Sequence, residues 1–133
     1  QGWLQSHAPT KNLRAGYFGA STGAGAALQA AAREPDAVGA VVSRGGRPDL
    51  AGPYLSRVTA PTLLLVGGED GPVIGMNEEA LTKLSCPKRL MIIPGATHLF
   101  EEPGTLEQVA QAALHWFRRY LHPEPHQAKE SLQ

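Results

Sequence analysis

Short apolar runs alternate along this chain with stretches of helical composition. The first apolar run begins at Ala15 and contains aromatic residues; it is followed by a turn of small residues. An alanine-rich stretch then continues to Arg33, and Pro35 prevents it from going further. This order predicts a strand, a tight turn and a helix.

Three further apolar runs have the length and composition of strands. Val38–Ser43 is rich in β-branched residues, Thr62–Val66 follows a proline, and Leu90–Ile93 precedes a Pro-Gly pair. Continuous apolar runs of this kind are typical of parallel strands that are buried on both faces. We therefore expect three more buried strands, with the GGRPD segment (45–49) as a loop after the first of them.

Two helices are predicted between and after these strands. Asn77 is suited to cap a short helix of about two turns, which must end before Pro87. Thr105 and Gln108 fit a capping box at the start of a longer helix. The apolar face predicted for that last helix consists of Leu106, Val109, Ala110, Ala113, Leu114, Phe117 and Leu121.

Strands that alternate with helices and short Gly/Pro loops favour an α/β fold, a parallel sheet in a three-layer α/β/α sandwich. Functional groups in such folds gather at the carboxyl ends of the strands. Ser21, Arg44, Asp70 and His98 each follow a predicted strand, so we expect these four side chains to lie at one edge of the sheet.

Length and charge narrow the class of protein. A chain of 133 residues predicts one compact unit, which we place at residues 1–122, followed by a flexible polar tail at 123–133. Twelve basic and twelve acidic residues cancel, so no nucleic acid or anionic membrane is expected as a partner. No apolar run is long enough to cross a bilayer. A lone cysteine, Cys86, and the absence of a basic and apolar leader at the N-terminus favour a soluble protein of the cytoplasm.

Ser21 stands in a Gly-x-Ser-x-Gly sequence between a predicted strand and a predicted helix, the setting in which this motif carries meaning. A sharp strand-to-helix turn crowds its neighbours, so we expect both Gly19 and Gly23 to be required. The helix that follows directs the positive end of its dipole at the serine, and the backbone N–H of Thr22 is the expected oxyanion donor.

A serine hydroxyl needs a histidine base, and that histidine needs a carboxylate to orient it. Of the five histidines only His98 directly follows a strand, in PGATH. Asp70 follows the preceding strand in VGGED and is the expected acid, with Glu69 as its competitor. The chain order serine, aspartate, histidine is that of the α/β-hydrolases.

Through GASTG, TLLLVGGEDGPVIGMN and PGATHLFEEPG, the sequence resembles the α/β-hydrolase superfamily over residues 1–122, and within it the dienelactone-hydrolase-like branch. SRGGRPDLA and PGATHLFEEPG make it similar to the hydrolase domain that is fused to a phosphoribosyltransferase domain in some bacterial proteins. Dienelactone hydrolases proper carry a cysteine at the elbow, where this chain has Ser21. This difference from the family pattern argues against dienelactone itself as the substrate.

The resemblance also implies that several strands precede the elbow in the complete fold, of which this chain is the C-terminal portion. Those strands would supply the second oxyanion donor and cover the edge of the strand that begins at Ala15. The partners expected on this basis are a second copy of the chain, the missing N-terminal segment, or a phosphoribosyltransferase-like domain. The chain alone is then either an active hydrolase or a catalytically silent half that needs its partner.

The activity expected is hydrolysis of carboxylic esters, lactones or thioesters through an acyl-enzyme, without a metal or an organic cofactor. Besides Thr22, the residues expected to line the pocket for this small-molecule substrate are Ala20, Ser43, Arg44 and Leu99. Arg44 has two equal interpretations: it holds an anionic substrate, or it pairs with a carboxylate of its own loop, where Asp49 lies.

Two rival interpretations have less support. Gly19, Gly23 and Gly25 invite a dinucleotide site with Arg44 near a 2′-phosphate, but Leu28 stands where that motif needs a small residue. His122 and His126 have the spacing of zinc ligands on a helix, but prolines break the helix between them and no third ligand is apparent.

Overall fold

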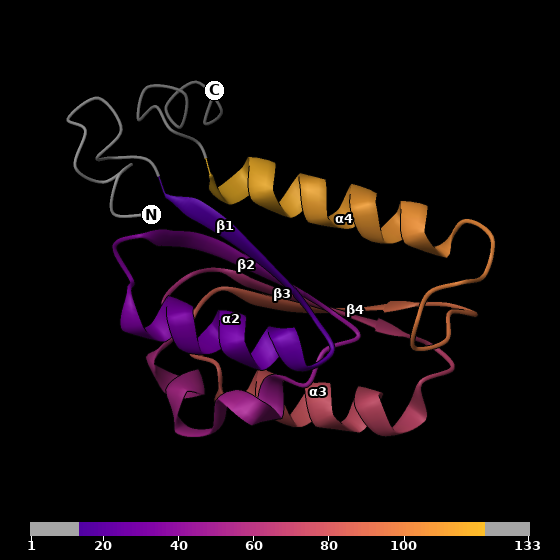
Figure 1. The fold of residues 1–133 in the computed structure, drawn as a ribbon, viewed down its shortest axis with the longest axis horizontal. Coiled ribbons are helices and arrows are strands. Elements are labelled where there is room, and N and C mark those ends of the chain that lie inside the picture. The colour runs from indigo at the N-terminus through magenta and orange to yellow at the C-terminus, as the bar shows by residue number, and fades with distance from the viewer. Residues whose placement is uncertain (1–13, 122–133) are drawn as a thin grey trace.

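A computed structural model describes residues 14–121. The tail predicted at 123–133 lies outside these residues. Four strands form one sheet in the order β1-β2-β3-β4, and each neighbouring pair is parallel (Figure 1). The strands are β1 (Ala15–Ala20), β2 (Val38–Arg44), β3 (Thr62–Gly67) and β4 (Lys88–Ile93).

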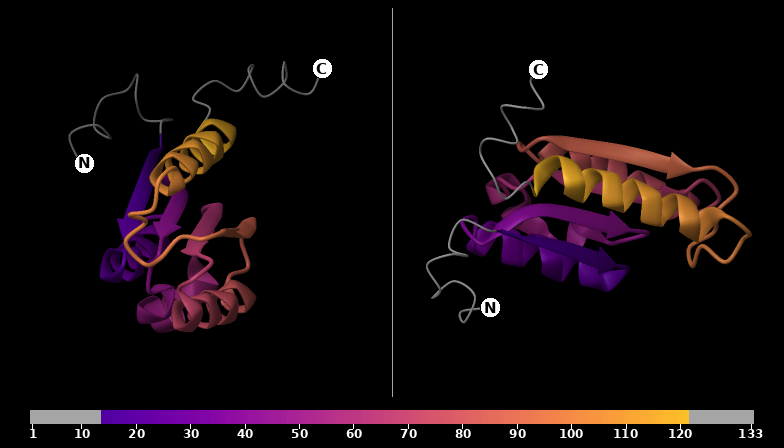
Figure 2. Two further views of the ribbon diagram at one scale, coloured as in Figure 1. Left: turned by 90° about the vertical axis from the view of Figure 1, so that its right-hand side faces the viewer. Right: turned by 90° about the horizontal axis from the view of Figure 1, so that it is seen from above.

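Helices cover both faces of this sheet. Helix α4 (Thr105–Tyr120) lies on one face, while α2 (Thr22–Arg33) and α3 (Gly71–Lys83) lie on the other (Figures 1 and 2). The 3₁₀ segment η2 (Pro48–Arg57) packs beside α2 and α3. Parallel neighbours require crossover connections of this kind. The predicted three-layer α/β/α fold is thus confirmed.

Two hydrophobic clusters hold the layers together, one on each face of the sheet. Val41 and Leu64 point into the cluster beneath α2, η2 and α3, while Val42, Leu63 and Leu65 point into the cluster beneath α4. Alternate residues of β2 and β3 therefore enter different clusters, which explains why both strands read as continuous apolar runs.

The two outer strands are less covered. β4 is an edge strand that begins at Lys88, and its Ile92 is 39% exposed, so the expectation of a fully buried fourth strand is wrong. An edge strand has a neighbour on one side only, and basic residues at its start are a common protection there. On β1, at the opposite edge, Phe18 is 50% exposed.

Helix α3 begins at Gly71, directly after Asp70, so the prediction of a two-turn helix capped by Asn77 is wrong. Pro72 sits in the first turn, where its missing N–H leaves no hydrogen bond unmade. Asn77 lies inside the helix and is fully buried; its amide donates to the carbonyls of Val73 and Gly46. Asn77, which the local sequence pattern predicted as a helix N-cap, thus makes a tertiary hydrogen bond instead.

Helix α4 also departs from prediction at its start and on its face. The N-cap is Gly104, and Thr105 Oγ1 donates to the carbonyl of Glu102, so the capping box with Gln108 is not formed. Trp116 is buried on the sheet, whereas Leu106 and Leu114 are each 50% exposed. Ala110, between these two leucines, is exposed as well. The apolar stripe of α4 is therefore wider than the surface that the sheet covers.

The segment after β2 is more ordered than the predicted loop. Only residues 45–47 are irregular, and the 3₁₀ turns of η2 begin at Pro48. These turns are interrupted at Gly52, whose φ of 54° is left-handed. The short connection keeps the end of β2 close to the turn that carries Ser21.

Candidate active site

Ser21 sits on a strained turn between β1 and α2, with φ 50° and ψ −124°. Positive φ is uncommon for a residue with a side chain and tends to occur where function needs it. A Cβ on Gly19 would lie 2.6 Å from the Gly23 carbonyl oxygen and 2.7 Å from Ala24 Cα. A Cβ on Gly23 would meet nothing within 4 Å. The requirement for a glycine is therefore observed at position 19, and the same expectation for Gly23 is wrong.

Backbone hydrogen bonds fasten this turn to the loop after β2. The Ser21 N–H donates to the Arg44 carbonyl at 3.4 Å, and the Arg47 N–H donates to the Ser21 carbonyl at 2.9 Å. Gly45 has a φ of 53°, and a Cβ there would lie 3.2 Å from the His98 carbonyl oxygen. The loop after β2 thus packs between the serine turn and the segment that carries His98.

Ser21, His98 and Asp70 form one chain of hydrogen bonds. Ser21 Oγ lies 3.0 Å from His98 Nε2, and His98 Nδ1 lies 2.8 Å from Asp70 Oδ2. An ionised carboxylate only accepts hydrogen bonds, so Nδ1 carries the proton and the Nε2 lone pair faces the serine hydroxyl. Asp70 is 13% exposed and His98 39% exposed. The competing Glu69 is exposed and makes no contact with this histidine.

The segment that carries His98 is held by Glu102, a residue that sequence reasoning missed. One carboxylate oxygen accepts the Thr97 N–H at 3.0 Å, and the other accepts the Thr97 hydroxyl at 2.6 Å. These hydrogen bonds from Thr97 lower the pKa of Glu102. Phe100, whose φ is 56°, is buried beneath the same segment. The local signal for this Glu102 clamp on Thr97 was limited to a threonine directly before His98 and an acidic residue four positions after it.

The other predicted site residues are distributed unevenly around Ser21. Thr22 begins α2 and is exposed, and no acceptor among residues 14–121 pairs with its N–H. Ala20 is half-buried and Leu99 is 57% exposed. Ser43, in contrast, is fully buried, with its Oγ against Gly46, so its side chain does not reach the surface beside the serine.

Arg44 lies at the end of β2, and its guanidinium stands 5.7 Å from the centre of the Phe100 ring. Its Nε is buried without a hydrogen-bond partner among the described residues. Asp49, the carboxylate expected to compete for Arg44, instead forms a bidentate pair with Arg47, at 2.9 and 3.0 Å. That pair lowers the pKa of Asp49. The loop alternative considered for Arg44 is therefore not observed.

The described residues also bear on metals and membranes. Within residues 14–121 no three His, Cys, Asp or Glu side chains gather closely enough to hold a metal ion. His122 and His126, the spacing considered for zinc, lie outside that range. None of the helices described has the length and apolarity that a membrane span needs.

Comparison with known proteins places this arrangement in a family. The family model described as dienelactone hydrolase family matches residues 2–122. The chain belongs to the dienelactone hydrolase family. A solved dienelactone hydrolase from Anabaena variabilis is 63% identical with a TM-score of 0.86, and the match covers 91% of this chain and 56% of that one. The resemblance noted in the sequence is thereby confirmed.

More distant structures share the fold. The esterase domain of a Rhodothermus marinus protein has a TM-score of 0.74 at 21% identity, over 91% of this chain and 66% of that one. A monoacylglycerol lipase from Paleococcus ferrophilus has a TM-score of 0.67 at 18% identity, over 86% and 72%. At these identities the likeness shows the fold alone; the match to the dienelactone hydrolase family is what supports a hydrolase.

Curated relatives show that the family's domain occurs within longer proteins. Two proteins of Mycobacterium tuberculosis, from strains H37Rv and CDC 1551, are named provisionally as phosphoribosyl transferases and are 59% identical over 120 residues. That match covers 90% of this chain but only 27% of each relative. The chain thus spans about a quarter of the curated relatives and just over half of the Anabaena structure.

Proposed function

We propose that this chain carries the catalytic centre of a serine hydrolase that cleaves carboxylic esters, lactones or thioesters. The observation that carries the proposal is the hydrogen-bonded chain from Ser21 through His98 to Asp70, built on a strained strand-to-helix turn. These distances support the proposed roles of Ser21 as nucleophile, His98 as base and Asp70 as the acid that orients His98.

The first half-reaction forms an acyl-enzyme. His98 Nε2 takes the proton of the Ser21 hydroxyl as Oγ attacks the substrate carbonyl carbon, and the carbonyl oxygen becomes an oxyanion. Asp70 stabilises the imidazolium through its hydrogen bond to Nδ1. The carbon–oxygen or carbon–sulfur bond then breaks, and the leaving alcohol or thiol takes the proton from His98. In a lactone that alcohol stays attached to the acyl group.

The second half-reaction repeats these steps with water. His98 removes a proton from a water molecule, the hydroxide attacks the acyl carbon, and the collapse of the second oxyanion returns Ser21 with its proton. The oxyanion donor proposed on this chain is the N–H of Thr22, at the positive end of the α2 dipole. A second donor is proposed to come from the part of the domain that precedes the elbow.

Substrate contacts are proposed for the residues that surround the serine at the surface. Ala20 and Leu99 offer apolar surface for an acyl chain, and Thr22 lies beside the oxyanion. Arg44 is proposed to offer its guanidinium to an acidic group on the substrate, because Asp49, the carboxylate of its own loop, is already paired with Arg47.

A second candidate function is that of an interaction half that is silent without its partner. The exposed Phe18 on β1, together with Leu106 and Leu114 on α4, supports it, since all three are large apolar side chains about half exposed. Within residues 14–121 β1 has a neighbouring strand on one side only, so its other edge adds backbone donors and acceptors that another strand would satisfy. The partner proposed is the N-terminal half of a dienelactone-hydrolase-like domain; a second copy and a phosphoribosyltransferase-like domain are the alternatives.

Covalent labelling by a fluorophosphonate, followed by intact mass, tests the proposal without knowledge of the substrate. We expect one adduct on the parent chain, none on Ser21→Ala, and a rate lowered by about 10³–10⁴ in Asp70→Asn, which holds the wrong histidine tautomer. Glu69→Gln is the matched control and retains labelling. Circular dichroism establishes that each variant is folded.

A complementation arm separates the two candidate functions. The N-terminal half of the Anabaena variabilis enzyme is added as a separate polypeptide, and labelling is measured with and without it. If Ser21 is labelled in the isolated chain, the chain is a hydrolase on its own. If Ser21 is labelled only when the N-terminal polypeptide is present, the chain is an interaction half that needs its partner. Absence of labelling in both arms, with a folded chain, would refute the serine hydrolase centre.

A further inference from the structure

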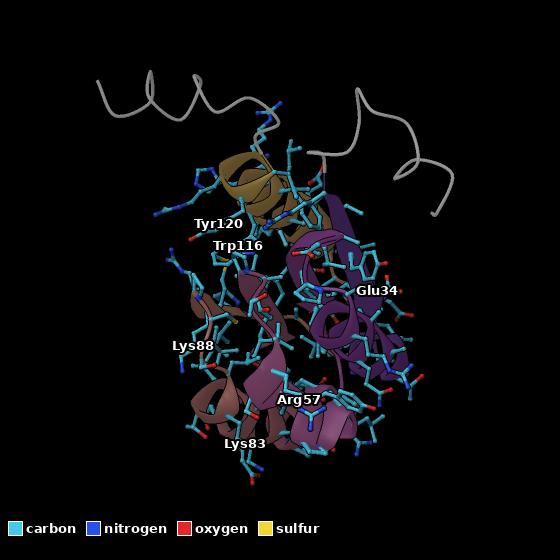
Figure 3. The ribbon with its side chains drawn as sticks, turned by 90° about the vertical axis from the view of Figure 1, so that its left-hand side faces the viewer. Glu34, Arg57, Lys83, Lys88, Trp116 and Tyr120 are labelled. Carbon is cyan, nitrogen blue, oxygen red and sulfur yellow. The ribbon has the colours of Figure 1, made fainter. Side chains whose placement is uncertain are left out.

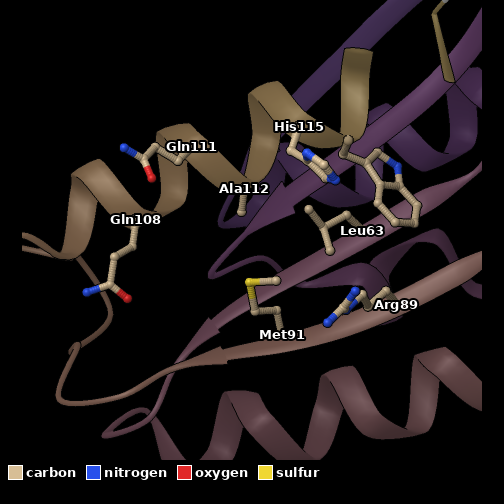
Figure 4. A pocket seen from close by; sticks show the side chains of 8 residues that line it. Leu63, Arg89, Met91, Gln108, Gln111, Ala112 and His115 are labelled. Carbon is tan, nitrogen blue, oxygen red and sulfur yellow. The ribbon is translucent and has the colours of Figure 1, made fainter. Parts of the chain in front are cut away.

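A cavity lies between β4 and α4, and none of its lining residues belongs to the Ser21 site. Its volume is about 420 Å³, and its apolar lining comes from Leu63, Met91, Ala112 and Trp116. Figure 4 shows Met91 and Arg89 on β4 facing Ala112 and His115 on α4 across this space. It opens to solvent on one side, and its volume falls within the range of small-molecule sites.

Ala112 lies on the flank of α4 that faces β4, and its short side chain is one of those that border the space above Met91. Trp116 forms the firm end of the cavity: it is 8% exposed, its indole N–H donates to the Pro61 carbonyl at 3.1 Å, and its ring lies 4.8 Å from that of Tyr120 (Figure 3). The indole is thus anchored before any ligand arrives.

The polar wall of the cavity has no acidic residue. Arg89 contributes the cation from β4, while His115, Gln108 and Gln111 contribute hydrogen-bonding groups from α4. Among residues 14–121 no carboxylate lies within ion-pair distance of Arg89. The neighbouring cation, Lys88, is turned away and donates to the carbonyls at the end of α3.

We propose that this cavity binds a medium-chain carboxylate, with the alkyl chain along Met91, Leu63 and Trp116 and the carboxylate on Arg89. Arginine matches a carboxylate with two parallel donors, and the apolar floor buries the methylene groups. The binding site is independent of the Ser21 chemistry, because none of its lining residues takes part in that site.

Tryptophan fluorescence measures the binding. The chain has two tryptophans, so a Trp3→Phe background leaves Trp116 as the single reporter. Octanoate is titrated against 1-octanol, octylammonium and acetate, which separate the contributions of chain and charge. We expect saturable binding of octanoate, and at least about fivefold weaker binding of each of the other three.

Matched variants locate the site. Arg89→Gln should weaken octanoate binding by up to about fivefold, while Arg118→Gln, on the same helix as His115, should leave it unchanged. Ala112→Leu should occupy part of the cavity beside Met91 and weaken octanoate binding, whereas Ala110→Leu, on the exposed flank of α4, should not.

Four outcomes would overturn the proposal. These are no saturable signal with octanoate, equal affinity for 1-octanol, unchanged affinity in both Arg89→Gln and Ala112→Leu, or loss of binding in Arg44→Gln, which would place the carboxylate at the Ser21 site. Arg89 is an exposed surface residue, so Arg89→Gln tests the site even where Ala112→Leu fails to fold.

Discussion

The two glycines that flank Ser21 provide a matched test of the strained turn. A Cβ at position 19 would stand 2.6–2.8 Å from three backbone atoms of Gly23 and Ala24, whereas a Cβ at position 23 would meet nothing within 4 Å. Neither glycine has a positive φ, so the substitutions differ in steric fit and not in backbone preference. Gly19→Ala and Gly23→Ala therefore insert the same methyl group into opposite environments.

The expected changes in stability have opposite signs. Backbone atoms at these distances cannot give way as a side chain would, so Gly19→Ala should cost about 1–3 kcal/mol, as overpacking does elsewhere. Gly23→Ala, in the first turn of α2, should stabilise by about 0.5–1 kcal/mol. At roughly 4 °C per kcal/mol for a domain of this size, Tm should fall by about 4–12 °C in the first variant and rise by about 2–4 °C in the second.

Thermal unfolding followed by circular dichroism measures both changes, and fluorophosphonate labelling of Ser21 at a temperature where all variants are folded measures the geometry of the turn. Gly19→Ala should label more slowly than the parent, because relief of the clash displaces the Ser21 peptide. Equal Tm values for the two variants would refute the steric reasoning, as would a Gly23→Ala variant that is the less stable of the pair.

Three further predictions concern single side chains. Asn77→Ala should lower the free energy of unfolding by about 2–3 kcal/mol in urea titrations, because a buried carbonyl after β2 loses its donor. Burial raises the pKa of Cys86, so its thiol should react with a disulfide reagent far more slowly in the folded chain than in the unfolded chain. The free energy of unfolding should also fall as pH rises from the thiol pKa of the unfolded chain to the higher thiol pKa of the folded chain. Glu102→Gln should slow labelling of Ser21, whereas Glu101→Gln should not. The hydrogen bonds from Thr97 lower the pKa of Glu102 in the folded chain. The stabilisation by Glu102 should therefore be complete above the carboxyl pKa of the unfolded chain and be lost as pH falls through the carboxyl pKa of the folded chain.

The local sequence pattern was sufficient to predict the strands and the functional residues that follow them. β2 and β3 are buried on both faces, which favours apolar side chains along most of their length, and the sequence shows this directly. The Gly-x-Ser-x-Gly turn is equally local, because its crowding arises among residues 19–24. Parallel strands place their carboxyl ends at one edge, so the meeting of Ser21, Asp70 and His98 followed from topology.

A contact between distant segments decided the role of Asn77. Its side chain is of the type that caps helices, yet its amide donates to the carbonyl of Gly46, 31 residues away, inside the core. The partner of Asp49 was a local choice instead: Arg47, two residues before it, forms the ion pair, and Arg44 does not.

What the sequence determined by itself is thus the order of elements and the identity of the chemical groups, since both depend on periodicity and on short turns. The tertiary structure decided which groups are held, exposed or left without a partner. The exposed stripe of α4 and the cavity above Met91 both depend on how α4 crosses the sheet, and that crossing is set by packing between residues far apart in the chain.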